Sequence, residues 1–254
     1  MSDMIKRFIY HLRGLDAFFE TKGTIGNVRG FMEQSECKAL FFAAKSAPGD
    51  GVVVEIGSYV GKSTIWMAKA LKARQRGKMY AIDPHTGDPY SDVLQNERKQ
   101  FALGQEGEFR KNISDAAVQD VVIPIVKTSE EASVDFDKPI RLIFIDGIHE
   151  YDFVKTDFLL WSPKVIENGI IAFHDSLRPG VKRVFEELLY NSKSYELIGR
   201  VYYTSFFRKK GKRRFTDMMF DLRFDMIFPQ YQGNKKIIAA ALNFLAGIIS
   251  LFIF

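Results

Sequence analysis

In the middle of the chain, short runs of consecutive apolar residues alternate with segments in which apolar residues recur at helical spacing. Strands that are apolar on both faces are typical of a parallel sheet covered by helices on each side. We therefore predict a doubly wound α/β domain over about residues 35–210. The expected parallel strands are 52–56, 78–82, 121–126, 141–145 and 169–173.

Helices are expected between these strands, and an antiparallel pair is expected at the end of the domain. The predicted pair of strands covers 195–201 and 203–207, so the sheet is mostly parallel with a C-terminal antiparallel strand pair. The predicted helices cover 35–46, 62–74, about 94–117, 151–166 and 181–190.

Two flanking segments differ from this domain. Within residues 1–34, apolar residues from Ile5 to Phe19 recur at helical spacing, which predicts an amphipathic helix. We expect it to pack on the domain as a cap, and a substrate lid or a membrane-surface helix are the alternatives. Charges run through this stretch, so we expect no signal peptide. Within residues 211–254, the segment 237–254 is uncharged and apolar, and it predicts a second helix. We expect this helix either to attach to a membrane or to be buried in a dimer or against the N-terminal helix.

The charge of the chain is concentrated at one end. The formal net charge is +5, but residues 200–254 hold ten Lys and Arg against three Asp. The remaining 199 residues are therefore slightly acidic, and the basic run favours anionic lipid near the apolar segment. A nucleic-acid partner is not favoured, because no recognisable motif with an aromatic platform accompanies the basic run.

The single cysteine, Cys37, excludes an internal disulfide and a cysteine-based metal framework. A reducing compartment follows, so we expect a cytoplasmic protein, placed at the inner face of the membrane if 237–254 is an anchor.

A glycine turn follows the first strand of the domain. Gly57 and Gly61 enclose three residues, one fewer than a phosphate-binding P-loop requires. Tyr59 stands where a dinucleotide fingerprint needs its second glycine. Two interpretations of this turn remain: a plain turn without a ligand, and a site for S-adenosylmethionine. This cofactor has a cationic amino-acid end, and Glu55 before the turn and Asp83 at the end of the next strand supply acids.

Two further motifs carry a resemblance to a known family. Asp146-Gly147-Ile148-His149 follows the fourth strand, and Phe173-His174-Asp175 ends the fifth. With the glycine turn and Asp83, they resemble in order and spacing the class I S-adenosylmethionine-dependent methyltransferases. Within these they resemble the small O-methyltransferases, which include macrocin-type and cephalosporin hydroxylase-like proteins. The resemblance covers about residues 35–205 and implies a Rossmann-like fold.

The resemblance also implies roles for individual residues. The methionine end of the cofactor would be lined by residues of the glycine turn, the ribose would be held by one acid, and the adenine would meet the loop after the third strand. These residues are Glu55, Gly57, Ser58 and Gly61 for methionine, Asp83 for ribose, Ser129 for adenine, and Asp146 beside the cofactor.

Metal-dependent relatives carry oxygen ligands at the positions of Asp146, His174 and Asp175. Here the middle residue is a histidine, which is a poor ligand for Mg²⁺ and suits transition metals better. The sequence therefore leaves open whether the protein uses a divalent ion such as Mg²⁺. His149 and Asp146 are the expected catalytic residues, with His149 as the general base that deprotonates a hydroxyl.

These inferences predict an S-adenosylmethionine-dependent O-methyltransferase. The expected acceptor is a hydroxyl of a sugar, a glycan or a natural product. The alternative is a non-catalytic, membrane-associated module that retains the cofactor fold. A homo-oligomer is left open.

Overall fold

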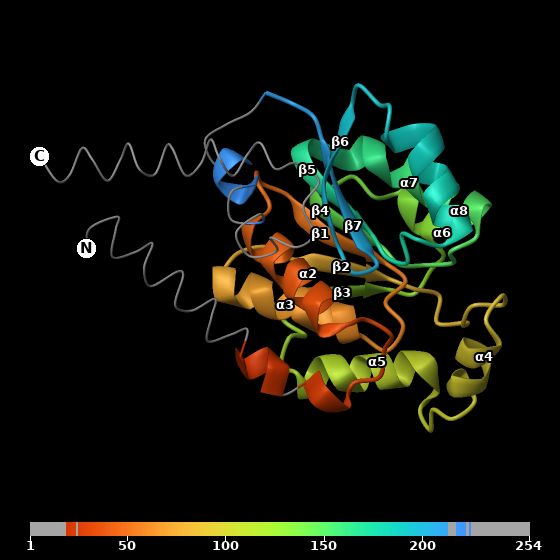
Figure 1. Cartoon of the computed structure of the whole chain (residues 1–254). Helices are drawn as coiled ribbons and strands as arrows, with labels where there is room; N and C mark the ends of the chain where they lie inside the picture. The colour runs from red at the N-terminus through yellow and green to blue at the C-terminus, as the bar shows by residue number, and fades with distance from the viewer. Residues whose placement is uncertain (1–18, 24, 213–216, 222–223, 225–254) are drawn as a thin grey trace, which may run out of the picture.

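The computed structural model describes residues 19–23, 25–212, 217–221 and 224. Seven strands form one sheet in the order β3-β2-β1-β4-β5-β7-β6 (Figure 1). The strands β1 to β5 are parallel, whereas β7 pairs antiparallel with both β5 and β6. The strands are β1 (Val52–Ile56), β2 (Met79–Ile82), β3 (Val122–Ile125), β4 (Ile140–Ile145), β5 (Val165–Phe173), β6 (Tyr195–Val201) and β7 (Thr204–Lys209).

Helices cover both faces of this sheet (Figure 1). One face packs against α2, α3 and α5, and the other packs against α6, α7 and α8. The predicted doubly wound architecture is confirmed, including the antiparallel strand pair at its C-terminal edge. The helices are α2 (Gln34–Ser46), α3 (Lys62–Arg74), α4 (Asp92–Arg98), α5 (Gly104–Asp115), α6 (Ser129–Val134), α7 (Tyr151–Trp161) and α8 (Pro179–Val184).

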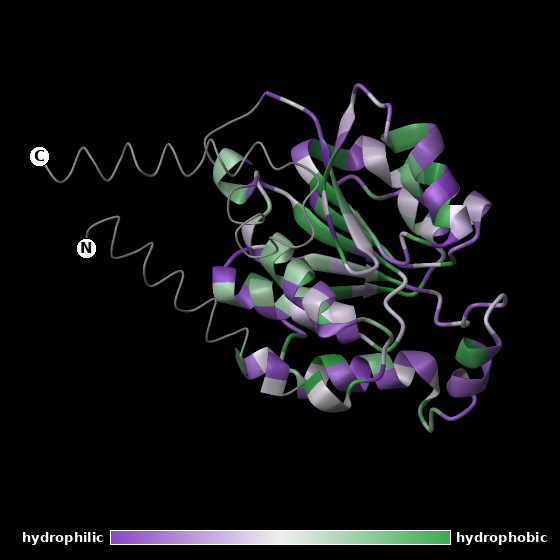
Figure 2. Cartoon of the chain, viewed as in Figure 1, coloured by the Kyte–Doolittle hydropathy of each residue, from purple (hydrophilic) through white to green (hydrophobic). Residues whose placement is uncertain are grey.

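The central strands are mostly apolar because their successive side chains enter two different cores. In β5, Ile170 lies in the core under α2 and α3, and its neighbour Ile171 lies in the core under α7 and α8. The inner strands β1, β4 and β5 are correspondingly hydrophobic over most of their length (Figure 2). A strand buried on both sides cannot show the alternation of a half-exposed strand.

Two predicted helices have the wrong bounds. The segment 94–117 is not one helix: α4 ends at Arg98 and α5 begins at Gly104, whose φ of 68° suits a glycine at the break. The helix predicted over 151–166 ends at Trp161, because Ser162–Lys164 forms a 3₁₀ turn that includes Pro163.

A short helix, α6, replaces the loop expected after the third strand. Thr128 caps it: its hydroxyl accepts the backbone N–H of Glu131, and the Glu131 carboxylate accepts the backbone N–H of Thr128. This reciprocal pair is the capping box, which the spacing of Thr128 and Glu131 already contains.

Part of the C-terminal extension packs onto the α/β domain. The rings of Phe220 and Phe224 lie 5.4 and 6.2 Å from that of Phe42 on α2, and Asp221 forms a buried ion pair with Arg208 on β7. Residues 217–221 and 224 are therefore continuous with the core rather than separate from it. The helix predicted within residues 1–34 lies almost entirely outside the described residues, and the segment 237–254 lies wholly outside them.

None of the helices among the described residues is long and apolar enough to cross a membrane.

Candidate functional site

The candidate residues gather where the parallel strands end. Gly57, Asp83, Asp146 and His174 directly follow β1, β2, β4 and β5, respectively. The strands β2 and β4 lie on opposite sides of β1, so the strand order reverses its direction at β1. In open α/β sheets, ligands bind at the carboxyl ends of the strands beside such a switch of direction.

The glycine turn closes tightly against the end of β4. Gly57 has a φ of 84°, and a Cβ atom there would stand 2.2 Å from the backbone oxygen of Asp146. Gly61 has a φ of 95° and is the N-cap residue of α3. Only glycine meets both demands at position 57, a left-handed conformation and a neighbouring backbone in contact. The turn and the loop after β4 therefore form one surface.

Glu55 lies behind this turn and is completely buried in β1. The Thr64 hydroxyl donates a hydrogen bond to its carboxylate. Burial raises the pKa of Glu55 to about 7, although the hydroxyls of Ser58, Ser63 and Thr64 partly oppose the shift. Glu55 thus supports the turn from inside the sheet, rather than standing open at its surface.

Asp83 joins the end of β2 to the glycine turn. Its two oxygens accept the backbone N–H groups of Tyr59 at 2.7 Å and His85 at 2.6 Å. Each oxygen keeps a lone pair that can accept from a ligand hydroxyl. His85 itself is buried against Phe109, and burial lowers the pKa of its imidazole.

Tyr59, which the sequence marked only as the residue that interrupts a dinucleotide fingerprint, makes several contacts in this region. Its hydroxyl donates to Glu97 on α4, and its ring lies 6.2 Å from that of Phe31 and 5.8 Å from that of Phe101. The tyrosine that interrupts the dinucleotide fingerprint therefore anchors α4 and the segment around Phe31 to the glycine turn. Its φ of 49° could not be predicted from the sequence, because tyrosine rarely adopts a positive φ.

Ser129 begins α6, and its hydroxyl accepts the indole N–H of Trp161 at 2.8 Å. It also forms a hydrogen bond with Asp157, which is buried. Burial raises the pKa of Asp157 to about 7. The Ser129 side chain thus helps to pack α6 against α7, and its predicted contact with adenine stays a prediction.

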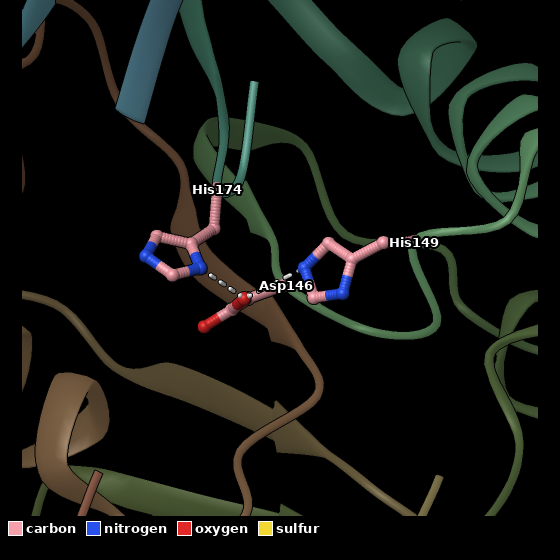
Figure 3. A group of neighbouring side chains, drawn as sticks. All are labelled: Asp146, His149 and His174. Atoms are coloured by element: carbon pink, nitrogen blue, oxygen red, sulfur yellow. Dashed lines mark ion pairs between the residues drawn. The ribbon is translucent and has the colours of Figure 1, made fainter. Parts of the chain in front are cut away.

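The loops after β4 and β5 bring Asp146, His149 and His174 together (Figure 3). Nδ1 of His174 lies 2.9 Å from Oδ1 of Asp146, and Nε2 of His149 lies 3.4 Å from the same oxygen. The second ring nitrogen of His149 points away from Asp146 (Figure 3). Two imidazoles and one carboxylate therefore share one small cluster.

The electrostatics of this cluster follow from its charges. Burial would raise the pKa of Asp146, but His174 and His149 outweigh burial and lower it, so the carboxylate stays ionised. Burial would lower the pKa of His174, but Asp146 and Glu36 outweigh burial and raise it to about 11. Glu36, from α2, was not expected in the site from the sequence.

Asp175 stands beside the cluster but is bound elsewhere. Its Oδ2 lies 2.6 Å from Nε of Arg178 and 3.8 Å from Nε2 of His149. The structure thus brings His149, and not Asp175, into the group of possible ligand atoms that lie within 4.8 Å of one another. Mg²⁺ prefers oxygen ligands in octahedral geometry. Two nitrogens and one oxygen that is already paired with His174 do not fit Mg²⁺, and we derive no catalytic step through it.

Known proteins match the same region of the chain. Residues 54–176 match the family model of a methyltransferase domain. This range contains the candidate residues from Glu55 to Asp175. A stretch of 132 residues, 49% of the chain, is 26% identical to an uncharacterized protein of Sinorhizobium fredii. That match covers only 13% of the length of the Sinorhizobium protein.

Solved structures share the fold. The O-methyltransferase NovP superposes with a TM-score of 0.59 at 18% identity, covering 70% of this chain and 80% of NovP. The O-methyltransferase TomG from Streptomyces achromogenes, solved in complex with S-adenosylmethionine, superposes with a TM-score of 0.52 at 16% identity. That match covers 78% of this chain and 90% of TomG.

Proposed function

Because the chain carries a methyltransferase domain over residues 54–176, we propose that it transfers the methyl group of S-adenosylmethionine to a hydroxyl oxygen. The single observation that carries this proposal is the contact between the glycine turn and the end of β4, where Gly57 closes on the backbone of Asp146. This contact puts the turn that would hold the methyl donor next to the cluster that can take a proton. Donor and acceptor sites would therefore share one wall.

The residues around the turn suit this donor. S-adenosylmethionine has no phosphate, so a turn with two glycines leaves room for its methionine end beside Gly57, Ser58 and Gly61. Asp83 lies against the same turn, and each of its oxygens keeps a lone pair that can accept from a ribose hydroxyl. The ionised carboxylate of Asp146 favours a cationic ligand beside the turn, and Glu55 is proposed to support the methionine end from inside the sheet. Ser129 is proposed for the adenine end.

His149 is the proposed general base. The ionised Asp146 draws the imidazole proton to Nε2, so Nδ1 keeps a lone pair that can accept the proton of the acceptor hydroxyl. Bound S-adenosylmethionine supplies a methyl group already activated on a sulfonium. As the oxygen–carbon bond forms and the sulfur–carbon bond breaks, the hydroxyl proton passes to His149. Positioning can contribute roughly 7–11 kcal/mol to such a step.

We propose a sugar, glycan or natural-product hydroxyl as the acceptor. Two exposed aromatic pairs near the strand ends support a ring-shaped acceptor: Tyr202 with Tyr203 on the β6–β7 turn, and Tyr90 with Phe153. Aromatic faces pack well against the apolar face of a ring and leave hydroxyls free for polar partners.

Calorimetry with S-adenosylmethionine tests the proposal first. We expect saturable binding to the full chain and weaker binding to the Asp83→Ala variant. Absence of binding to the folded wild type would overturn the enzyme function. Methyl transfer from isotope-labelled S-adenosylmethionine to a panel of glycans and phenolic natural products then identifies the acceptor. Binding without transfer to any acceptor in a broad panel would favour the non-catalytic module.

Membrane attachment through 237–254 stays a proposal from the sequence. Deleting residues 237–254 and fractionating cells tests it: an unchanged membrane fraction would exclude the anchor. A homo-oligomer also stays a proposal, and light scattering of the full chain tests it.

A further inference from the structure

Glu36 is a completely buried carboxylate that the proposed chemistry does not use. It is the third residue of α2, outside the stretch that matches the methyltransferase domain. Its Oε2 accepts the backbone N–H of Glu33, and this bond completes a capping box at the start of the helix. Capping boxes work at the surface, so capping alone does not explain why this carboxylate is fully buried.

The other oxygen of Glu36 points into the site. Its Oε1 accepts the Thr204 hydroxyl at 2.7 Å and the backbone N–H of Tyr203 at 3.2 Å, both at the β6–β7 turn. It also lies 3.5 Å from Nε2 of His174. Glu36 therefore joins three parts of the fold: α2, the β6–β7 turn and the end of β5.

We propose that Glu36 is a positioning residue of the catalytic centre: it holds the His174 ring so that its Nδ1 stays on Asp146, beside His149. The geometry that carries this proposal is a continuous row of four groups. Glu36 lies 3.5 Å from His174, His174 lies 2.9 Å from Asp146, and Asp146 lies 3.4 Å from His149. The inference rests on the proposed function, because His149 is its proposed general base.

The charges of these groups explain why both ring nitrogens of His174 face a carboxylate. An imidazole between two carboxylates is best satisfied when both nitrogens donate, and it then carries a positive charge. That charge sits between the carboxylate of Glu36, which is completely buried, and that of Asp146, which is partly buried, and it offsets the cost of burying them. The positive ring keeps Asp146 ionised, and the raised pKa of His174 agrees with this arrangement. His174 then has no lone pair to offer a metal ion.

Removing the charge of Glu36 would free the His174 ring. Its Nε2 would face a neutral group. The ring could then lose a proton, which removes the positive charge beside Asp146, or turn, which removes the 2.9 Å contact of Nδ1 with Asp146. A small displacement of Asp146 would then misplace His149. A misplacement of about 1 Å can lower a rate by roughly 100-fold.

The experiment compares Glu36→Gln with two matched variants. Glu33→Gln changes the exposed partner in the same capping box and does not touch His174. Thr204→Val removes the hydroxyl that donates to the same oxygen of Glu36. The readout is the side-chain ¹H–¹⁵N spectrum of His174, assigned with His174→Gln. Melting temperature and S-adenosylmethionine affinity show that each variant is folded.

We expect both nitrogens of His174 to be protonated at pH 7.5 in the wild type, Glu33→Gln and Thr204→Val. In Glu36→Gln, we expect one nitrogen to lose its proton while S-adenosylmethionine affinity changes less than about threefold. Once an acceptor is known, Glu36→Gln should lower kcat by roughly 10–100-fold.

Three outcomes would overturn the inference. They are a neutral His174 ring in the wild type, an unchanged His174 spectrum in Glu36→Gln, and a shift of the wild-type spectrum on adding Zn²⁺ or Mn²⁺ that shows His174 to be a metal ligand. If Glu36→Gln does not fold, the wild-type spectrum and its response to these ions still decide the question. Failure of S-adenosylmethionine to bind the wild type would instead overturn the proposed function, so the two failures are distinguishable.

Discussion

Gly57 and Asp146 touch through their backbones, so that a Cβ atom on Gly57 would stand 2.2 Å from the Asp146 carbonyl oxygen. The two residues end neighbouring strands, β1 and β4. Their contact joins the glycine turn to the cluster of Asp146, His149 and His174. The first prediction tests this contact directly.

Gly57→Ala should destabilise the protein and weaken cofactor binding together. The added methyl group meets backbone, which cannot move aside as a flexible side chain could, and the φ of 84° is strained for alanine. We expect a loss of at least about 1–3 kcal/mol in the free energy of unfolding. Chemical denaturation and calorimetry with S-adenosylmethionine measure the two effects.

Gly147→Ala is the matched control, because a Cβ there meets atoms at 3.5 and 3.6 Å, which are ordinary contacts. We expect near wild-type stability. Equal losses in both variants would contradict the role given to the contact of Gly57.

Asp83→Asn should weaken S-adenosylmethionine binding more than it lowers stability. The amide keeps an acceptor oxygen for only one of the two backbone N–H groups, those of Tyr59 and His85, and it loses the charge and an acceptor site for the ribose. Hydrogen bonds to charged groups contribute about 1.5–3 kcal/mol, so we expect the dissociation constant to rise about 10–100-fold. Asp92→Asn, at the exposed start of α4, should bind like the wild type. Unchanged affinity in Asp83→Asn would remove Asp83 from the cofactor site.

His149→Ala should lower turnover and leave cofactor affinity almost unchanged. General base catalysis contributes roughly 10²–10⁴-fold, and His149 lies beside Asp146 rather than on the glycine turn. Single-turnover methyl transfer and calorimetry separate the two effects, and Asp152→Asn on the exposed side of α7 is the control. A collapse of cofactor binding in His149→Ala would show that the histidine is structural.

Glu55→Gln should stabilise the protein at alkaline pH and not at acidic pH. Burial raises the pKa of Glu55 to about 7, whereas an exposed Glu in the unfolded chain titrates near 4.5. The unfolded chain releases this proton first, so the free energy of unfolding falls as the pH rises from about 4.5 to 7. Glutamine removes this loss, which we expect to reach at most about 3 kcal/mol above pH 7.

Urea denaturation at pH 5 and pH 8 measures the difference between Glu55→Gln and the wild type. Glu150→Gln, an exposed glutamate, should show no such dependence on pH. A Glu55→Gln variant that is less stable than the wild type at pH 8 would contradict the prediction.

The order of strands and helices was available from the sequence, because strands buried on both faces are continuously apolar. The same pattern placed Gly57, Asp83, Asp146 and His174 at strand ends, since each of them directly follows one of four apolar runs. Boundaries were less predictable. The break between α4 and α5 depends on one glycine conformation. The helix α6 is too short to show a helical pattern of apolar residues.

Only the tertiary structure decided which side chains meet. Glu36 reaches His174 because α2 docks across the sheet, and no local pattern relates residues so far apart in the chain. Asp175 pairs with Arg178 instead of joining Asp146, and His149 takes the place beside Asp146. Periodicity fixes which face of an element is buried, but the distances between side chains depend on how the elements pack. The sequence thus determined the strand ends that carry the site, and packing determined which groups there share protons and charge.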